Sequence, residues 1–423
     1  MSLRIRRSTL TGPPFPAVLL SLHLRLLVAP CLLVASPVAA QMRVYSVESN
    51  LPALAGGRMV AERTPLGRTA NLFVMGLTPL DSPYANVFTL AQEFPDINLR
   101  GDTVAYVARY TNPLIGASYW DGDAIFEDLT GDGRPDVLVS GNTREVGALP
   151  LPEVVLFRDP PTWSRSAVPL PALYASRFAL RGSVLALAGR GSSGLTLEVH
   201  SVTRAATPTF TRLAQLPGVE FPALALGDCD ADGDHDLFAA GADANGLPVA
   251  TLYRNDAGTF TAATTLPGLF RGDAAFGDVD GDGDADLAYT GVRYGPGLAE
   301  GNVLAYRMQG CVPTPIVVPV QLRNMIGEFL AFEDVTGDGR VDIAVSGFDE
   351  PFRDRLVYLR LAAGDGAGSF TYIERSERQT YGTGSGTLLG LPGNGSRPSF
   401  LGMGIGNANI PGVWFYSRPS DVN

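Results

Sequence analysis

The sequence predicts an all-β fold, a seven-bladed β-propeller with calcium-binding hairpin loops, and three observations carry this prediction. An acid- and glycine-rich motif occurs four times, in segments that begin at Phe126, Leu226, Phe276 and Phe332. An apolar strand that closes in glycine ends each motif and recurs at three further places. The segments between these repeats hold short strand-like runs separated by Gly, Asp and Pro, and none has the pattern of a helix.

The repeat period sets the number of blades. The motifs place their first aspartate at Asp128, Asp228, Asp278 and Asp334, so one unit is missing between the first two. The strand VLALAG fills that gap after a shortened loop, and NLFVMG and SFLGMG add one unit before and one unit after the motifs. The seven units then end in Gly76, Gly141, Gly189, Gly241, Gly291, Gly347 and Gly404. A period of about fifty residues is typical of blades with four short strands.

A propeller must close its ring, and both ends of the chain offer strands for this. MRVYSV begins at Met42, and GVWFYS begins at Gly412. Because an unpaired sheet edge invites association with other chains, we expect one of these strands to complete the blade that the other begins.

The four motifs have the ligand pattern of a calcium loop, with oxygen side chains at positions 1, 3, 5 and 9 and glycine at position 6. Position 7 contributes only its backbone carbonyl, so arginine is acceptable there. Threonine at position 3 of the second and sixth units predicts weaker sites, because those loops carry less ligand charge. The predicted ligands are Asp128, Thr130, Asp132, Arg134 and Asp136; Asp228, Asp230, Asp232, Asp234 and Asp236; Asp278, Asp280, Asp282, Asp284 and Asp286; and Asp334, Thr336, Asp338, Arg340 and Asp342.

Up to four calcium ions are expected, and their role is structural because each loop uses its own acids as ligands and the loops recur around the ring. An EF-hand is excluded, since no helices flank the loops. The three degenerate units lack the loop acids, and we expect them to remain blades without metal, held by strand pairing and apolar packing.

The pattern D-x-[DT]-x-D-G-x-x-D, followed by an apolar strand and glycine, resembles the FG-GAP, or VCBS-type, repeat of integrin α-chain heads and of many secreted bacterial proteins. Four of the seven units match this pattern. The resemblance implies a seven-bladed propeller with calcium held in the hairpin loop between the first two strands of a blade. It leaves the function open, because this fold serves many functions.

The start of the chain is expected to direct export. Residues 1–40 have a basic segment around Arg6, an apolar segment and a small-residue cleavage site that ends at Ala40, which predicts a signal peptide followed by the propeller at 41–423. No uninterrupted apolar run of about 20 residues predicts a membrane span. We expect a monomer in a secreted, periplasmic or extracellular location. The formal net charge of −11 argues against nucleic acid as a partner.

Two cysteines, Cys229 and Cys311, follow the predicted cleavage site. A disulfide between neighbouring blades and a pair of free thiols both fit the sequence, because the separation of their Cα atoms is not set by the spacing.

The loops that enter the inner strands are the candidate ligand surface, on the face opposite the metal loops. They repeat an aromatic residue and carry nearby charges, which suits a shallow protein or carbohydrate site, although packing between blades explains aromatics there as well. The residues concerned are Tyr119, Trp120, Tyr174, Phe221, Phe270 and Phe329, with Arg177, Arg271, Asp121, Asp123 and Glu220.

The sequence therefore favours a binding or scaffold module with a protein or carbohydrate ligand. The alternative is a glycan-active extracellular enzyme, a polysaccharide lyase or hydrolase on a propeller scaffold. No nucleophile with assignable partners supports it, and His200 and His235 are interpreted as a surface residue and a solvent-facing spacer.

Overall fold

The computed structural model describes residues 43–47, 55–61, 69–77, 83–93, 105–113, 119–143, 151–158, 162–294, 299–323, 325–336, 338–349, 357–375, 380–390, 398–406 and 411–417. The predicted signal peptide and Trp120's side chain lie outside this description, as does the loop of the seventh unit between its first two strands.

The described strands form seven four-stranded antiparallel sheets, which we call blades 1 to 7. Blade 1 contains β2 (Ala55–Ala61), β3 (Thr69–Leu77), β4 (Pro83–Glu93) and β5 (Ala105–Pro113). Blade 2 contains β6 (Tyr119–Glu127), β7 (Asp136–Thr143), β8 (Leu151–Arg158) and β9 (Ser164–Ala167). Blade 3 contains β10 (Tyr174–Arg181), β11 (Val184–Gly191), β12 (Gly194–Thr203) and β13 (Thr209–Leu216).

Blade 4 contains β14 (Glu220–Gly227), β15 (Asp236–Ala242), β16 (Pro248–Asp256) and β17 (Thr259–Thr265). Blade 5 contains β18 (Ala274–Gly277), β19 (Asp286–Tyr294), β20 (Ala299–Gln309) and β21 (Val312–Ile316). Blade 6 contains β22 (Met325–Glu333), β23 (Asp342–Asp349), β24 (Val357–Gly364) and β25 (Phe370–Arg375). Blade 7 contains β26 (Thr380–Gly390), β27 (Pro398–Gly406), β28 (Pro411–Ser417) and β1 (Arg43–Val47).

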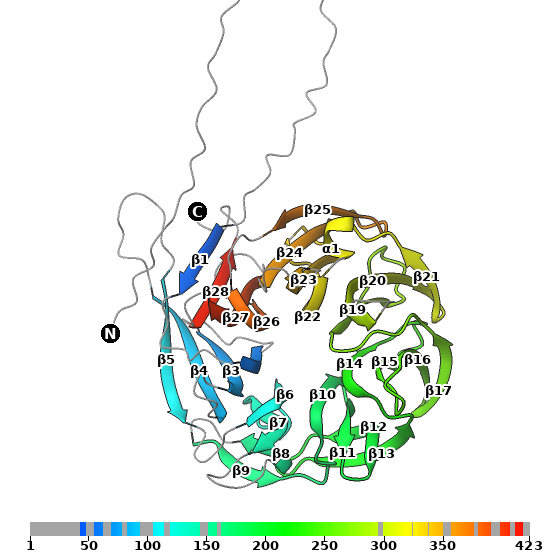
Figure 1. The fold of residues 1–423 in the computed structure, drawn as a ribbon. Helices are drawn as coiled ribbons and strands as arrows, with labels where there is room; N and C mark the ends of the chain where they lie inside the picture. Colours follow the sequence, from blue (N-terminus) through cyan, green and yellow to red (C-terminus); the bar gives the residue numbers. More distant parts are fainter. Residues whose placement is uncertain are drawn as a thin grey trace, which may run out of the picture.

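The blades are arranged in a ring around a central axis (Figure 1). The first strand of each blade packs against the first strand of the next, and β26 of blade 7 returns to β2 of blade 1. The all-β propeller class is thereby confirmed. One element departs from the expectation that the chain has no helix: α1 (Val320–Arg323), a single turn, connects blade 5 to blade 6.

The ring closes with strands from both ends of the chain. β1 pairs antiparallel with β28, from Arg43 opposite Ser417 to Val47 opposite Val413. The expectation that one terminal strand completes the blade of the other is confirmed, and β1 is the outermost strand of blade 7 (Figure 1).

Apolar packing between successive blades forms the described core. Between blades 4 and 5, Phe238 and Leu252 pack against Leu287 and Tyr289, and the ring centroids of Phe238 and Tyr289 lie 4.6 Å apart. Comparable clusters join blades 1 and 2, 2 and 3, 3 and 4, and 5 and 6. The second strand of a blade is buried on both of its faces, which explains why the strand that follows each motif is almost wholly apolar.

The repeated glycine lies in the second strand of every blade, and close backbone approach explains it in three of them. A Cβ atom at Gly189, Gly241 or Gly291 would lie 2.7, 2.8 or 2.9 Å from a carbonyl oxygen at the start of the inner strand or, for Gly291, just before it. These distances are too short for any side chain, so the position requires glycine.

Candidate metal centre

The four acidic motifs form the hairpin loops between the first and second strands of blades 2, 4, 5 and 6, as predicted. In each loop the position-1 carboxylate accepts hydrogen bonds from the backbone of the turn that follows. Asp228 accepts from Asp232 N at 3.1 Å and from Gly233 N at 2.9 Å. The bond from the position-6 glycine recurs at Asp128 (2.8 Å), Asp278 (3.2 Å) and Asp334 (2.8 Å).

Glycine at position 6 is required by the turn itself. The φ angles of Gly133, Gly233, Gly283 and Gly339 are 82°, 94°, 97° and 85°. Only glycine adopts such angles without strain. The conformation bends the loop back over the position-1 carboxylate, to which the glycine N–H donates.

Position 5 stabilises the turn, and position 7 divides the loops into two kinds. The carboxylates of Asp132, Asp232, Asp282 and Asp338 each accept a hydrogen bond from the backbone N–H of position 7. In blades 4 and 5 the position-7 carboxylates also accept from the turn between the third and fourth strands, Asp234 from Ala257 N and Asp284 from Gly310 N. In blades 2 and 6 the arginines at position 7 are exposed, which fits a role for their carbonyl alone.

Position 9 is the most buried acid of each loop. The aspartates there, Asp136, Asp236, Asp286 and Asp342, are 0–1% exposed. Asp236 accepts from Cys229 N at 2.7 Å and from Asn255 N at 2.8 Å. Burial raises the pKa of Asp236, Asp286 and Asp342 to about 6, against the pull of these backbone hydrogen bonds. Burial likewise raises the pKa of Asp136.

Position 3 distinguishes blades 4 and 5 from blades 2 and 6. The outer oxygens (Oδ2) of Asp230 and Asp280 lie 3.6 Å from Arg254 Nε and 2.9 Å from Arg307 Nε. Their inner oxygens (Oδ1) are buried and have no hydrogen-bond partner within the described part of the chain. In blades 2 and 6 position 3 is Thr130 or Thr336 instead, and its interaction with the position-9 carboxylate only partly opposes the rise in pKa that burial causes.

The predicted ligands come together in two clusters within the described residues. One carboxylate oxygen from each of Asp228, Asp230 and Asp236 lies within 4.8 Å of the others, and the same holds for Asp278, Asp280 and Asp282. The donors in these clusters are carboxylate oxygens, a donor set that suits Ca²⁺ and does not suit zinc. The orphaned oxygens of Asp230 and Asp280 fit such an ion, because a buried carboxylate oxygen without a partner is costly.

Blade 3 has no acidic loop between its first two strands. A two-residue turn joins β10 to β11, with Arg181 opposite Val184, which agrees with the shortened loop read from the sequence.

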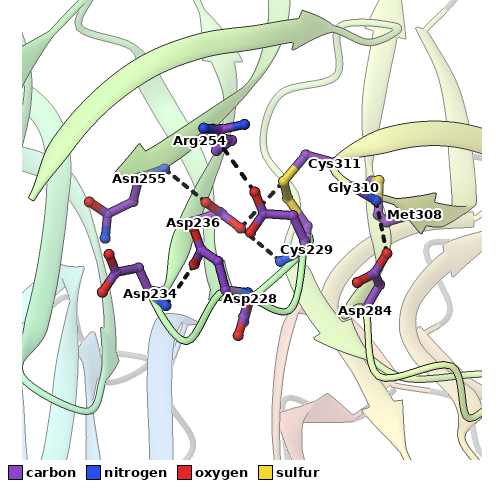
Figure 2. Close-up of a disulfide and its surroundings, with 12 residues drawn as sticks. Asp228, Cys229, Asp234, Asp236, Arg254, Asn255, Asp284, Met308, Gly310 and Cys311 are labelled. Carbon is purple, nitrogen blue, oxygen red and sulfur yellow. Dashed lines mark hydrogen bonds and ion pairs between the residues drawn. A yellow bond between two sulfur atoms is a disulfide. The ribbon is translucent and has the colours of Figure 1, made fainter. Parts of the chain in front are cut away.

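A disulfide joins the acidic loop of blade 4 to blade 5, which resolves the question that the sequence left open. Cys229 at loop position 2 is bonded to Cys311 in the turn between β20 and β21, with their Cα atoms 4.8 Å apart (Figure 2). Position 2 is occupied by the buried residues Leu129 in blade 2 and Val279 in blade 5. The disulfide therefore replaces an apolar contact with a covalent bond.

Most aromatics of the opposite face belong to the core. Tyr119, Phe270 and Phe329 are 1%, 5% and 8% exposed. Tyr174 and Phe221 are partly exposed. The guanidinium of Arg271 lies over the ring of Phe221, 4.4 Å from the ring centroid. The preceding residue, Glu220, accepts two hydrogen bonds from the guanidinium of Arg190, each 2.7 Å long. The pKa of Glu220 is lowered, chiefly by the hydrogen bond from Arg190 and further by the charge of Arg271.

The prediction that Asp123 is one of the charges on the candidate ligand surface is wrong. It is 2% exposed and its Oδ2 accepts a hydrogen bond from Phe178 N of the next blade at 2.9 Å. Asp273 repeats this contact with Leu330 N at 3.1 Å. Both carboxylates join neighbouring inner strands, a role that sequence spacing could not reveal. Arg177 donates to the carbonyls of Gly122 and Ser176, whereas Asp121 is exposed.

Both histidines are more buried than the sequence analysis predicted. His200 is 4% exposed, and its Nε2 lies 2.9 Å from Glu198, which also pairs with Arg212 at 2.8 Å. His235 is half-buried beside the blade 3 turn at Gly182. Burial lowers the pKa of both imidazoles.

A comparison with protein families agrees with the repeat predicted from the sequence. Residues 228–289, which run from the metal loop of blade 4 into β19, match the family described as FG-GAP-like repeat. This confirms the resemblance for that segment. No curated protein matches the chain. No helix within the described residues is long and apolar enough to span a membrane.

Three solved structures are similar in fold. A mutant of AofleA from Arthrobotrys oligospora has 10% identity and a TM-score of 0.43, covering 81% of this chain and 90% of its own. A mutant of Aleuria aurantia lectin in complex with alpha-methyl-L-fucoside has 9% identity and a TM-score of 0.44, covering 77% and 97%. A polysaccharide lyase described as an ulvan lyase has 11% identity and a TM-score of 0.47, covering 88% and 96%.

Proposed function

From an FG-GAP-like repeat set in an all-β propeller, we propose that this protein is an exported, calcium-stabilised binding module. Calcium would be structural, with up to four ions in the loops of blades 2, 4, 5 and 6. The ligand, a carbohydrate or a protein, would bind on the face opposite those loops.

One observation carries the metal part of the proposal. Within the described residues, Asp230 and Asp280 each have a buried carboxylate oxygen without a hydrogen-bond partner, and each belongs to a cluster of three carboxylates. Carboxylates held this close repel one another, and burial adds to the cost. A bound divalent cation removes both penalties, so metal binding adds directly to the free energy of unfolding.

The ligand surface is supported by the group around Phe221. A partly exposed aromatic ring provides a stacking face for a sugar or an aromatic side chain. Arg271 lies over the ring, and Glu220, the preceding residue in the chain, is held by its ion pair with Arg190, so both carry hydrogen-bonding groups in fixed positions.

Two measurements test the proposal. Elemental analysis after dialysis at millimolar calcium should find bound calcium, and finding none would refute the metal sites. Glycan and protein arrays should give a ligand whose binding is reduced at least tenfold by Phe221→Ala and unaffected by Val317→Ala, an exposed residue beyond β21. Release of reducing ends by the pure protein would establish the enzyme alternative instead.

A further inference from the structure

We propose that the calcium sites of blades 4 and 5 bind cooperatively, and that the Cys229–Cys311 disulfide carries most of the coupling. This inference rests on the proposed calcium sites and adds a relation between two of them. The argument follows a continuous path of contacts from one loop to the other (Figure 2).

The path begins inside the blade 4 loop. Cys229 lies between the proposed ligands Asp228 and Asp230 in the chain. Its backbone N–H donates to Asp236 Oδ2 at 2.7 Å. A shift of Cys229 therefore moves the flanking ligands and the hydrogen bond that orients the most buried carboxylate.

The path crosses to blade 5 at Cys311. Besides the disulfide, Cys311 N donates to Cys229 O at 2.8 Å, and the φ angle of Cys311 is 62°. A non-glycine residue in this left-handed conformation costs free energy that its surroundings must supply. The covalent bond and the hydrogen bond therefore fix the position of this turn relative to the blade 4 loop.

The path ends in the blade 5 loop. Gly310, the residue before Cys311, donates its N–H to Asp284 Oδ2 at 2.8 Å, and Met308 N donates to Asp286 Oδ1 at 2.7 Å. Thus the segment that carries Cys311 also positions two residues of the second site. A direct bond supplements it, from Ala285 N to Asp228 O at 2.7 Å.

Ordering of one loop by calcium then reduces the cost of ordering the other. When two sites share a rigid connection, binding at the first lowers the conformational freedom that the second must lose, and the effect is reciprocal. Within the described residues this disulfide is the one covalent link between two loops. The coupling between the sites of blades 5 and 6, whose described residues share no such link, therefore serves as an internal comparison.

A double-mutant cycle tests the coupling on the full exported chain. Asp232→Asn disables site 4, and calcium affinity is measured at site 5 by titration calorimetry with and without the disulfide, which is removed by Cys229→Ala with Cys311→Ala. In the oxidised protein, loss of site 4 should weaken site 5 at least about fivefold. Without the disulfide, the same loss should weaken it less than about twofold. Asp338→Asn, which disables site 6, is the matched control. Its effect on the calcium affinity of site 5 should be the same with and without the disulfide.

Reduction of the unaltered protein by dithiothreitol provides the same comparison without mutation, with circular dichroism confirming that the ring stays folded. Equal coupling with and without the disulfide would overturn its role and assign the coupling to the Ala285–Asp228 bond. Independent binding in the oxidised protein would overturn the inference while leaving calcium binding intact. Failure of the unaltered protein to bind any calcium would instead refute the proposed sites themselves.

Discussion

At the scale of single residues, position 3 of the loop decides how much negative charge a site holds. Asp230 and Asp280 add a carboxylate, whereas Thr130 and Thr336 add only a neutral hydroxyl. Calcium affinity follows ligand charge and loop rigidity. We therefore expect the proposed calcium sites of blades 4 and 5 to be stronger than those of blades 2 and 6.

Asp230→Thr should convert the blade 4 loop into the type found in blades 2 and 6. We expect the calcium dissociation constant of that site to rise about tenfold or more, because one charged ligand is lost. Titration calorimetry measures it. Asp243→Thr, in the turn at the other end of β15, is the control and should leave every site unchanged; an equal effect of both substitutions would contradict the prediction.

The pKa values of the position-9 aspartates predict how calcium stabilisation depends on pH. Burial raises the pKa of Asp236, Asp286 and Asp342 from 3.8 to about 6 in the metal-free protein. A raised pKa means that the folded state binds more protons, so this stability is present below pH 4 and is lost as the pH rises through 6. Bound calcium requires the ionised carboxylates and removes that loss.

The gap in melting temperature between calcium-loaded and metal-free protein should therefore be several degrees larger at pH 7 than at pH 5. Thermal melts of dialysed protein with and without added calcium measure this gap. A gap that is constant or that narrows toward pH 7 would show that these carboxylates do not bind the ion.

At the scale of elements, the inner strands are joined by side-chain caps as well as by apolar packing. Asp123 and Asp273 accept hydrogen bonds from backbone N–H groups of the next blade. Asp123→Ala should lower the free energy of unfolding by about 1–3 kcal/mol, because it leaves Phe178 N buried without its acceptor. Asp121→Asn, an exposed change that keeps a residue tolerant of the left-handed φ of 52°, should change it by less than about 0.5 kcal/mol. Urea denaturation in excess calcium measures both, and equal losses would mean that the cap contributes nothing.

Sequence patterns predicted these elements where the determinants are local. The position-6 glycines follow from backbone angles and the repeated glycines from their place in a recurring strand. The closing strands pair opposite ends of the chain, but a ring of blades requires its ends to meet, so they too could be predicted. The ion pairs of Asp230 and Asp280 could not be predicted in this way. Their partners Arg254 and Arg307 come from the third strand of the blade, and arginine occurs throughout the chain. The burial of Asp123 and His200 and the pairing of Cys229 with Cys311 likewise depend on contacts between blades or distant strands, which composition does not encode.

At the scale of the whole molecule, proposed metal and covalent links are concentrated on one side of the ring. Blades 4 and 5 share the disulfide and the two acidic clusters, while blade 7 is joined by the pairing of β1 with β28. In excess calcium, hydrogen exchange should be slower in β15 and β19 than in β1 and β28, because opening the former also breaks metal and covalent contacts. Mass spectrometry of peptic fragments measures the rates, and equal protection around the ring would contradict this distribution.

The position of β1 at the outer edge of blade 7 has a consequence for association between copies. The strand that completes the ring comes from the opposite end of the sequence, and the edge of β28 does not distinguish its own β1 from that of another molecule. At high protein concentration, refolding should therefore give dimers in which two chains exchange this strand. Once formed, such dimers would separate only as fast as blade 7 opens, so dilution would release monomers slowly.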